Sequence, residues 1–446
     1  MAQLKLFGSA RGGAHVAKRG KKENPARQKK PLKALAIVLT VLLCLEGLYF
    51  LCIYSNIPFI VKYRTIYINT AMNTMRHQWL ATYFIPDNVI DKVRYEYGLQ
   101  VAASNGKESQ WGNAGASAEV TKPTVNEIEA EIVEEEKPDP EEQARLAREA
   151  FFEVFWEIDE ASMDAYVAEH PDVIANGWDS IHINEAGIED EGTSIESIYG
   201  EQVLGIDAAN GVLLLRVKGK GYRGVLAVGK NPAALSVETC STYGTVGQKI
   251  GVTAEEHNGV LAMNGSGFPD PGGAGKGERV AGYAMSNGVE YGSHFTQWAY
   301  KRIELREDNR FYIKDASAPT GDGTTDATEF QPAMIIDGVK YTTDYWTDTQ
   351  PRACIGQSDK YEILMLVIEG RYPLDGIVGT SVNTCSDILL KHGCMQAINL
   401  DGGSSAMMWF DGKYVMQSSS SPLRYSGGRP TPNAWVYKHA SAITEE

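Results

Sequence analysis

Cysteine and histidine are scarce in this chain, with 6 and 8 residues among 446. There is no C-x-x-C pair and no His/Cys cluster, so the spacing of a structural zinc site is missing. The basic turn at 218–223 lacks the Walker pattern, and no G-x-S-x-G elbow is present. These absences argue against a P-loop nucleotide site and a nucleophile-elbow serine hydrolase. We predict no cofactor and no metal, although calcium, which needs only oxygen ligands, stays open without an EF-hand loop.

Positive charge is concentrated at the N-terminus. Residues 1–33 carry ten Lys/Arg against one acid, a charge of +9, whereas the whole chain carries −15, so residues 34–446 carry −24. This asymmetry suggests two compartments. A strongly acidic main part argues against nucleic acid as a partner.

One long apolar run, ALAIVLTVLLCLEGLYFLCIY at 34–54, contains a single charge, Glu46. Its length suffices to cross a bilayer as a helix. The basic flank lies on its N-terminal side, which predicts a cytoplasmic N-terminus and an extracellular remainder. A cleaved signal peptide is the alternative, but no small-residue cleavage site follows, so we favour an uncleaved single-pass anchor in the cell membrane.

The chain divides into regions of different composition. We predict a basic cytoplasmic tail (1–33), a transmembrane helix (34–54), a juxtamembrane amphipathic segment (55–99), an acidic flexible linker (100–143), a small helical segment (144–200) and a catalytic-type domain (201–438). The last is β-rich: LLLRV and GVLAV predict a hairpin, and helices are expected at 243–256 and 384–392. The predicted class is α+β, a single mixed domain behind the anchor and linker.

Four cysteines lie beyond the apolar run, where disulfides are permitted. They allow three pairings between which the sequence does not choose, and free thiols are the alternative. They are Cys240, Cys354, Cys385 and Cys394.

The most informative stretch is AINLDGGSSAMM at 397–408. Apolar residues interrupted by Asn399 predict a buried strand that delivers Asp401 into a tight turn. Gly402 and Gly403 allow close backbone approach to a ligand, and successive N–H groups in such a turn can form an anion-binding nest. Ser404 adds a hydroxyl donor. An Asp-Gly hairpin turn is the plain alternative.

This run resembles the signature of the phosphodiester glycosidase family, many members of which read NLDGGGSST, with one more glycine and a threonine. Four further stretches resemble the family in the same order. They are VLAMNGSG at 260–267, PRACIGQ at 351–357, LMLVIEGRY at 364–372 and GGRPTPNAWV at 427–436. In the third, Glu369 stands where family members often have Asp in D-G-R. The fourth matches the family's R-x-x-x-N pattern with Arg429 and Asn433.

The resemblance implies hydrolysis of a glycosyl-1-phosphodiester at the sugar C1–O bond. Asp401 would be the central catalytic carboxylate, as base or nucleophile, with Glu369 as its partner. The other residues would bind substrate: Arg352, Arg371 and Arg429 as arginines suited to phosphate, Gly402, Gly403 and Ser404 as donors, and Asn264 and Asn433 as positioning groups. Turn asparagines and surface ion pairs are the structural alternatives for these residue types.

The predicted protein is a membrane-anchored extracytoplasmic glycosidase acting on phosphorylated glycans of the cell envelope or on exopolysaccharide. Two alternatives stay open. The domain could bind and export polysaccharide without catalysis, or it could be a phosphodiesterase that cuts P–O bonds.

Overall fold

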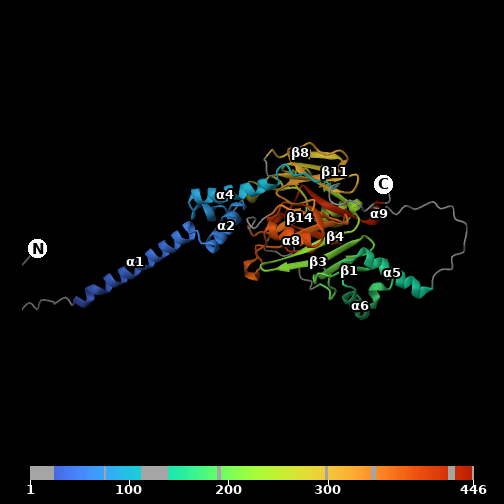
Figure 1. Ribbon diagram of the computed structural model, residues 1–446, viewed down its shortest axis with the longest axis horizontal. Coiled ribbons are helices and arrows are strands. Elements are labelled where there is room, and N and C mark those ends of the chain that lie inside the picture. The colour runs from blue at the N-terminus through green and yellow to red at the C-terminus, as the bar shows by residue number, and fades with distance from the viewer. Residues whose placement is uncertain are drawn as a thin grey trace, which may run out of the picture. The chain divides into compact units, whose positions relative to one another are not determined.

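The computed structural model describes residues 25–74, 77–111, 139–187, 192–296, 300–342, 348–419 and 427–443. The chain separates into two compact units, Met1–Val61 and Lys62–Glu446. The helices are α1 Pro25–Tyr54, α2 Pro58–Met72, α3 Trp79–Thr82, α4 Asp87–Val101, α5 Pro140–Val154, α6 Glu160–Glu169, α7 Ile250–Glu256, α8 Val382–Lys391 and α9 Ala440–Ile443 (Figure 1). The predicted α+β class is confirmed.

In the described residues, the strands fall into three antiparallel sheets. The first, of nine strands in the order β1-β2-β3-β4-β15-β14-β16-β12-β13, comprises β1 His182–Asn184, β2 Gln202–Asp207, β3 Val212–Gly219, β4 Tyr222–Gly229, β12 Ala333–Ile336, β13 Val339–Lys340, β14 Arg352–Ser358, β15 Ile363–Ile368 and β16 Cys394–Asn399. The second, β10-β9-β11-β7-β8, comprises β7 Tyr283–Ser286, β8 Val289–Gly292, β9 Lys301–Arg306, β10 Phe311–Asp315 and β11 Thr324–Phe330. The third, β18-β17-β6-β19-β5, comprises β5 Leu235–Thr239, β6 Gly259–Asn264, β17 Met408–Phe410, β18 Lys413–Tyr414 and β19 Asn433–Lys438.

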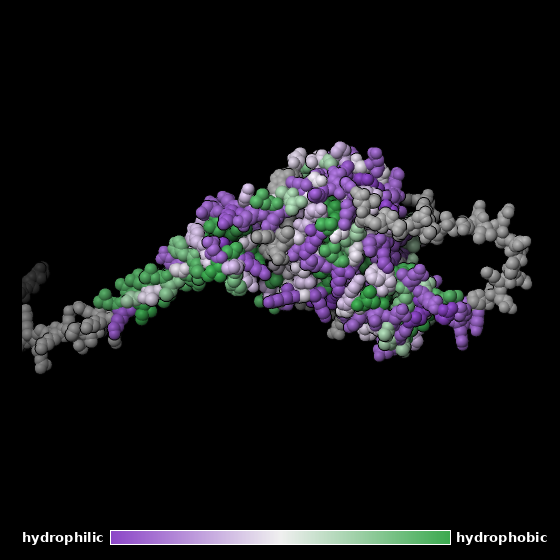
Figure 2. Space-filling view, in the orientation of Figure 1, coloured by the Kyte–Doolittle hydropathy of each residue, from purple (hydrophilic) through white to green (hydrophobic). Residues whose placement is uncertain are grey.

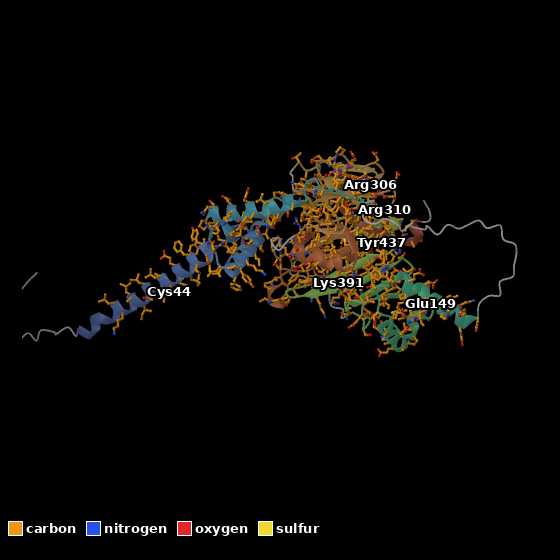
Figure 3. All side chains as sticks on the ribbon, in the orientation of Figure 1. Cys44, Glu149, Arg306, Arg310, Lys391 and Tyr437 are labelled. Carbon is orange, nitrogen blue, oxygen red and sulfur yellow. The ribbon has the colours of Figure 1, made fainter. Side chains whose placement is uncertain are left out.

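Helix α1 contains Leu32–Tyr54, a stretch long and apolar enough to cross a membrane. Hydrophobic residues cover it along its length (Figure 2), and Cys44 lies on its exposed surface (Figure 3). The helix begins at Pro25, inside the predicted basic tail. An anchor and a signal sequence both fit these properties. Residues 1–24 of that tail lie outside the described part of the chain.

The predicted juxtamembrane segment is helical, as α2, α3 and α4. The linker prediction needs correction at its start, because residues 102–111 are bonded to the large unit. The Trp111 indole donates to the Phe311 carbonyl at 2.7 Å, and the Ser109 hydroxyl donates to Gln396 Oε1 at 2.7 Å. Polar composition indicated a solvated chain, but these polar groups find partners about 200 residues away, which composition does not encode. Residues 112–138 of the predicted linker lie outside the described residues.

The predicted boundary near residue 200 is also wrong. Helices α5 and α6 lie beside β1, which is the edge strand of the nine-stranded sheet (Figure 1). Phe155 of this region belongs to the same buried cluster as Leu213 on β3 and Leu366 on β15. The helical segment therefore covers one face of the sheet, and its apolar stripe has no separate core of its own.

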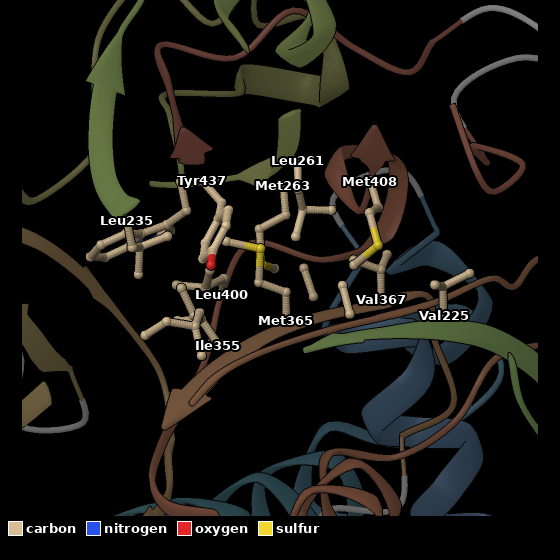
Figure 4. Packing of buried hydrophobic residues seen from close by; sticks show 14 of the residues in the cluster. Val225, Leu235, Leu261, Met263, Ile355, Met365, Val367, Leu400, Met408 and Tyr437 are labelled. Atoms are coloured by element: carbon tan, nitrogen blue, oxygen red, sulfur yellow. The ribbon is translucent and has the colours of Figure 1, made fainter. Parts of the chain in front are cut away.

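The main core lies between the nine-stranded sheet and the sheet containing β6 (Figure 4). Met263 on β6, Met365 on β15 and Met408 on β17 are all at most 1% exposed and occupy this layer. Leu400, also fully buried here, directly precedes Asp401. Burial of a leucine contributes about 2 kcal/mol, so Leu400 holds the following turn against the sheet.

The predicted hairpin is confirmed as β3 and β4, and the helix expected at 384–392 is α8. The helix expected at 243–256 is shorter, because only Ile250–Glu256 forms α7. Gly244 has a φ of +89°, and Gln248 forms a β-bridge with Thr431. Backbone pairing with a distant loop therefore replaces helical hydrogen bonds in the first half of that stretch.

Candidate active site

Antiparallel pairing brings the ends of three strands to one edge of the large sheet. Strand β14 starts at Arg352, which lies opposite Ile368 at the end of β15. Cys354 on β14 lies opposite Asn399 at the end of β16. The segments after β15 and β16 therefore leave the sheet together, and these segments carry Arg371 and Asp401.

The neighbouring sheet contributes a second edge. Strand β6 ends at Asn264, which lies opposite Ala434 near the start of β19. The Asn264 amide nitrogen donates to the backbone carbonyl of Asp401 at 2.8 Å, and its oxygen accepts from Met407 N at 3.1 Å. Asn264 therefore joins this sheet to both sides of the glycine turn.

The turn itself is shaped by its two glycines. A side chain on Gly402 would begin 2.7 Å from the Pro351 carbonyl oxygen, which leaves no room for a Cβ. Gly403 has a φ of +59°, and its amide donates to that same carbonyl at 2.9 Å. The sequence predicted a nest of N–H groups here, but the Gly403 N–H is directed to Pro351 instead.

Asp401 lies partly exposed among charged and hydroxyl groups. The pKa of its carboxyl is raised to about 6, chiefly by desolvation and also by the charge of Asp270. The Ser405 hydroxyl and the charges of Arg429 and Arg371 act in the opposite direction. An aspartate that titrates near neutrality is suited to proton transfer at physiological pH.

Arg429 forms an ion pair with Asp270 at 2.7 Å, and each side chain is 15% exposed. Its guanidinium also donates to Ser404 Oγ at 3.3 Å and to the Gly275 carbonyl at 3.1 Å. It lies over the Phe268 ring, 4.6 Å from the centroid. Asp270 is thus a second carboxylate of the site, and the sequence reasoning did not select it. Asp270 could have been found from sequence, because it is the only charged residue in FPDPGG, the stretch that follows the strand ending at Asn264.

Arg371 approaches the turn from the β15 side. It has a φ of +68°, a conformation that non-glycine residues rarely adopt and that often marks a functional loop. Its Nη2 donates to Gln350 Oε1 at 3.1 Å and lies 2.9 Å from where a Cβ on Gly403 would be. The Arg371 residue is exposed, but desolvation of its guanidinium lowers its pKa, as does the charge of Arg352. Within the described part of the chain, no carboxylate forms an ion pair with Arg371.

Glu369 is occupied elsewhere. Its Oε2 accepts from Arg223 Nε at 2.7 Å, and its Oε1 accepts from the Gln417 amide at 3.0 Å. Both carboxylate oxygens therefore have partners within the protein. Asp270, whose charge raises the Asp401 pKa, is the carboxylate that the structure associates with Asp401.

Two more of the selected residues are buried and fully engaged by backbone and side-chain groups. Arg352 forms an ion pair with Asp348 at 2.9 Å and donates to the Thr380 carbonyl at 3.1 Å. Asn433, 1% exposed, accepts from the Ser266 amide at 2.8 Å and donates to its hydroxyl at 3.1 Å. These contacts order the loops around the turn.

An aromatic group borders the site, and it was not singled out from sequence. Phe295 and Tyr300 have ring centroids 3.8 Å apart, and Phe330 meets Tyr300 edge-on at 6.2 Å. A Cβ on Gly267 would lie 3.0 Å from the Phe330 ring and 4.0 Å from Asp401 Cβ. Burial raises the pKa of Tyr300, and the charge of Asp401 adds to the rise.

No group of three or more His, Cys, Asp or Glu side chains in the described residues is arranged to hold a metal ion. The four cysteines of the large unit are free and buried. The structure brings six of the residues selected from sequence together. Arg371 and Arg429 lie against the glycine turn, which consists of Asp401, Gly402, Gly403 and Ser404.

Comparison with known protein families gives a match between residues 257–438 and the family model described as phosphodiester glycosidase. A curated relative, the SPbeta prophage-derived uncharacterized protein YomE of Bacillus subtilis strain 168, is 25% identical over 191 residues. That alignment covers 40% of this chain and 28% of the length of YomE, so the chain spans well under two thirds of this relative.

Among solved structures, one similar chain is the catalytic domain of zebrafish N-acetylglucosamine-1-phosphodiester alpha-N-acetylglucosaminidase, auto-inhibited by its pro-peptide. It has a TM-score of 0.41 and 15% identity, covering 59% of this chain and 90% of that one. A hypothetical protein from Synechocystis has a TM-score of 0.35 and 14% identity, with 54% and 65% coverage.

Proposed function

We propose that this chain is a glycosidase of the phosphodiester glycosidase family, which hydrolyses glycosyl phosphodiesters with Asp401 as the central carboxylate. The match of residues 257–438 to that family's model supports the proposal. The observation that carries the assignment is the environment of Asp401. Its pKa of about 6 leaves it mostly ionised at neutral pH yet able to take up a proton. Two arginines and a glycine turn surround it, as an anionic substrate requires.

In the proposed reaction, water attacks C1 of the sugar and the bond between C1 and the phosphate oxygen breaks. Both electrons of that bond stay with the oxygen, which leaves as part of a phosphate monoester. Asp401 accepts the proton of the attacking water and faces the positive charge that develops at C1. A phosphate monoester is a weakly basic leaving group, so stabilising its charge matters more than protonating it.

Arg371 is the residue best placed to hold that phosphate. Within the described residues it forms no carboxylate ion pair, although the charge of Asp401 acts on it. Its guanidinium lies against Gly403, where a Cβ would come within 2.9 Å of Arg371 Nη2. Ser404 adds a hydroxyl that can donate while its oxygen accepts from Arg429. Arg429 itself is paired with Asp270 and serves mainly to set the charge state of the two carboxylates.

The aromatic group is the proposed contact surface for the sugar ring. Tyr300 and Phe330 are half-buried, and a Cβ on Gly267 would lie 3.0 Å from the Phe330 ring and 4.0 Å from Asp401 Cβ. Aromatic faces pack against the C–H groups of sugars and exclude water from C1. Helix α1 would anchor this activity to a membrane, with phosphorylated envelope glycans or exopolysaccharide as the proposed substrate class.

The test uses the full chain, purified in detergent, and a panel of sugar-1-phosphodiesters. We expect free sugar and phosphate monoester from the wild type, and a loss of at least about 1000-fold in Asp401→Asn. Asp375→Asn, an exposed aspartate in the loop after Arg371, is the matched control and should keep full turnover. Full turnover by folded Asp401→Asn would refute the assignment. Polysaccharide binding without any turnover would instead favour an export or binding protein.

A further inference from the structure

Residues 348–352 form a strap between helices α2 and α4 and the glycine turn. On its outer side, the Asn73 amide, just after α2, donates to Asp348 Oδ2 at 2.8 Å. The Thr349 amide donates to the Thr70 hydroxyl at 3.2 Å. Two hydrogen bonds, separated by about 275 residues of sequence, thus tie α2 to the strap.

Helix α4 fixes the orientation of the Asn73 amide. Arg94 Nη1 donates to Asn73 Oδ1 at 2.7 Å and to Asn69 Oδ1 at 3.3 Å. Because a guanidinium can only donate, Asn73 must present its oxygen to Arg94 and its NH₂ to Asp348. The arginine also lies over the Tyr97 ring, 4.6 Å from the centroid. The amide is therefore held in one orientation, toward the strap.

On its inner side, the strap contacts the candidate active site at two points. The Pro351 carbonyl accepts the Gly403 amide at 2.9 Å. Gln350 accepts from Arg371 at 3.1 Å and donates from its Nε2 to Asp348 Oδ2 at 3.3 Å. Asp348, 1% exposed, is therefore shared between Asn73 and the residue that holds Arg371.

We propose that α2 and α4 complete the active site through this strap, and that Asn73 and Asp348 are positioning residues for Arg371 and the Gly403 turn. Thr70 and Asn73 lie in the same compact unit, Lys62–Glu446, as Arg371 and Gly403. The negative charge of Asp348 also partly compensates the charge of Arg352, which repels Arg371. The expected effect on turnover rests on the proposed function. The coupling of Asn73 and Asp348 to the Gly403 turn does not depend on that function.

Hydrogen exchange of the full chain in detergent tests the coupling without any substrate. Asn73→Ala should raise the exchange rate of the Gly403 amide about fivefold, since it removes a hydrogen bond that holds Asp348, three residues before the Pro351 carbonyl that accepts from Gly403. Thr70→Val, a nearly isosteric second variant, should act in the same direction. Asn88→Ala, an exposed asparagine on α4, is the matched control and should leave Gly403 unchanged. An unchanged exchange rate of the Gly403 amide in both folded variants, Asn73→Ala and Thr70→Val, would overturn the proposal.

A double-mutant cycle then tests the route to Arg371. We expect Asn73→Ala to lower kcat/KM about fivefold in the wild-type background and to have no further effect when Arg371 is already alanine. An equal loss in both backgrounds would show that Asn73 acts on stability alone and would overturn the positioning role. If the wild type shows no turnover, the proposed function fails, and the exchange experiment still decides the coupling.

Discussion

Replacing Arg429 with glutamine should move the acid limb of the pH–activity profile. The arginine lowers the pKa of Asp401, whereas the carboxylate of Asp270 raises it. Arg429→Gln removes the first influence and leaves the Asp270 charge without its partner at 2.7 Å. Both changes favour the protonated form of Asp401, so the pH below which kcat/KM falls should rise from about 6 by about one unit.

The same substitution has a cost in stability. Arg429 makes three hydrogen bonds, to Asp270, Ser404 and Gly275, and the ion pair is mostly but not wholly removed from water. Losing one partner of such a pair leaves a carboxylate uncompensated, which water can partly relieve at this exposure. We expect a loss of about 2 kcal/mol in the free energy of unfolding.

The assay measures kcat/KM from pH 4 to 9 for the wild type, Arg429→Gln and Arg279→Gln. Arg279 is an exposed arginine between β6 and β7, in the segment that also carries Asp270, and serves as the control. An acid limb that stays in place or moves to lower pH in folded Arg429→Gln would refute this electrostatic reasoning.

Three further predictions concern other groups. The wild type should lose about 2 kcal/mol of stability between pH 4 and 7 relative to Asp401→Asn, because a pKa raised to about 6 favours the folded state only while the carboxyl is protonated; denaturant unfolding measures this, and a pH-independent difference would contradict it. Glu369→Gln should lower stability by about 1–2 kcal/mol while retaining the acid limb, since its partners are Arg223 and Gln417; a shifted limb in the pH profile would restore it as a proton-transfer group. Cys354 and Cys394 should resist alkylation in the native protein, because burial raises the pKa of both thiols, and labelling by mass spectrometry before unfolding would contradict this.

The strand ends were predictable from sequence, and the charge pairs were not. Apolar runs stop at polar residues, so the sequence placed Asn264, Glu369 and Asp401 at or just beyond the ends of β6, β15 and β16. Which charges neutralise one another depends on contacts between distant segments. Glu369 accepts a hydrogen bond from Arg223, which lies 146 residues earlier in the chain, and no local sequence pattern predicts this contact.

Domain boundaries failed for a related reason. Composition indicated a linker from residue 100, yet Trp111 and its neighbours bond to strands far along the chain. The apolar face of an amphipathic helix such as α5 predicts that the helix packs against another surface, but it does not identify that surface. The strap likewise joins Asn73 to Asp348, a contact that only the folded chain reveals.

The proposed reaction breaks the bond between C1 and the phosphate oxygen, with Asp401 as the central carboxylate. Hydrolysis of a sugar-1-phosphodiester by the full chain in ¹⁸O-labelled water, followed by mass spectrometry of both products, tests it most directly. We expect the label on C1 of the released sugar and none in the phosphate monoester, with no release by Asp401→Asn. Label in the phosphate would contradict the account and make the protein a phosphodiesterase that cuts P–O bonds.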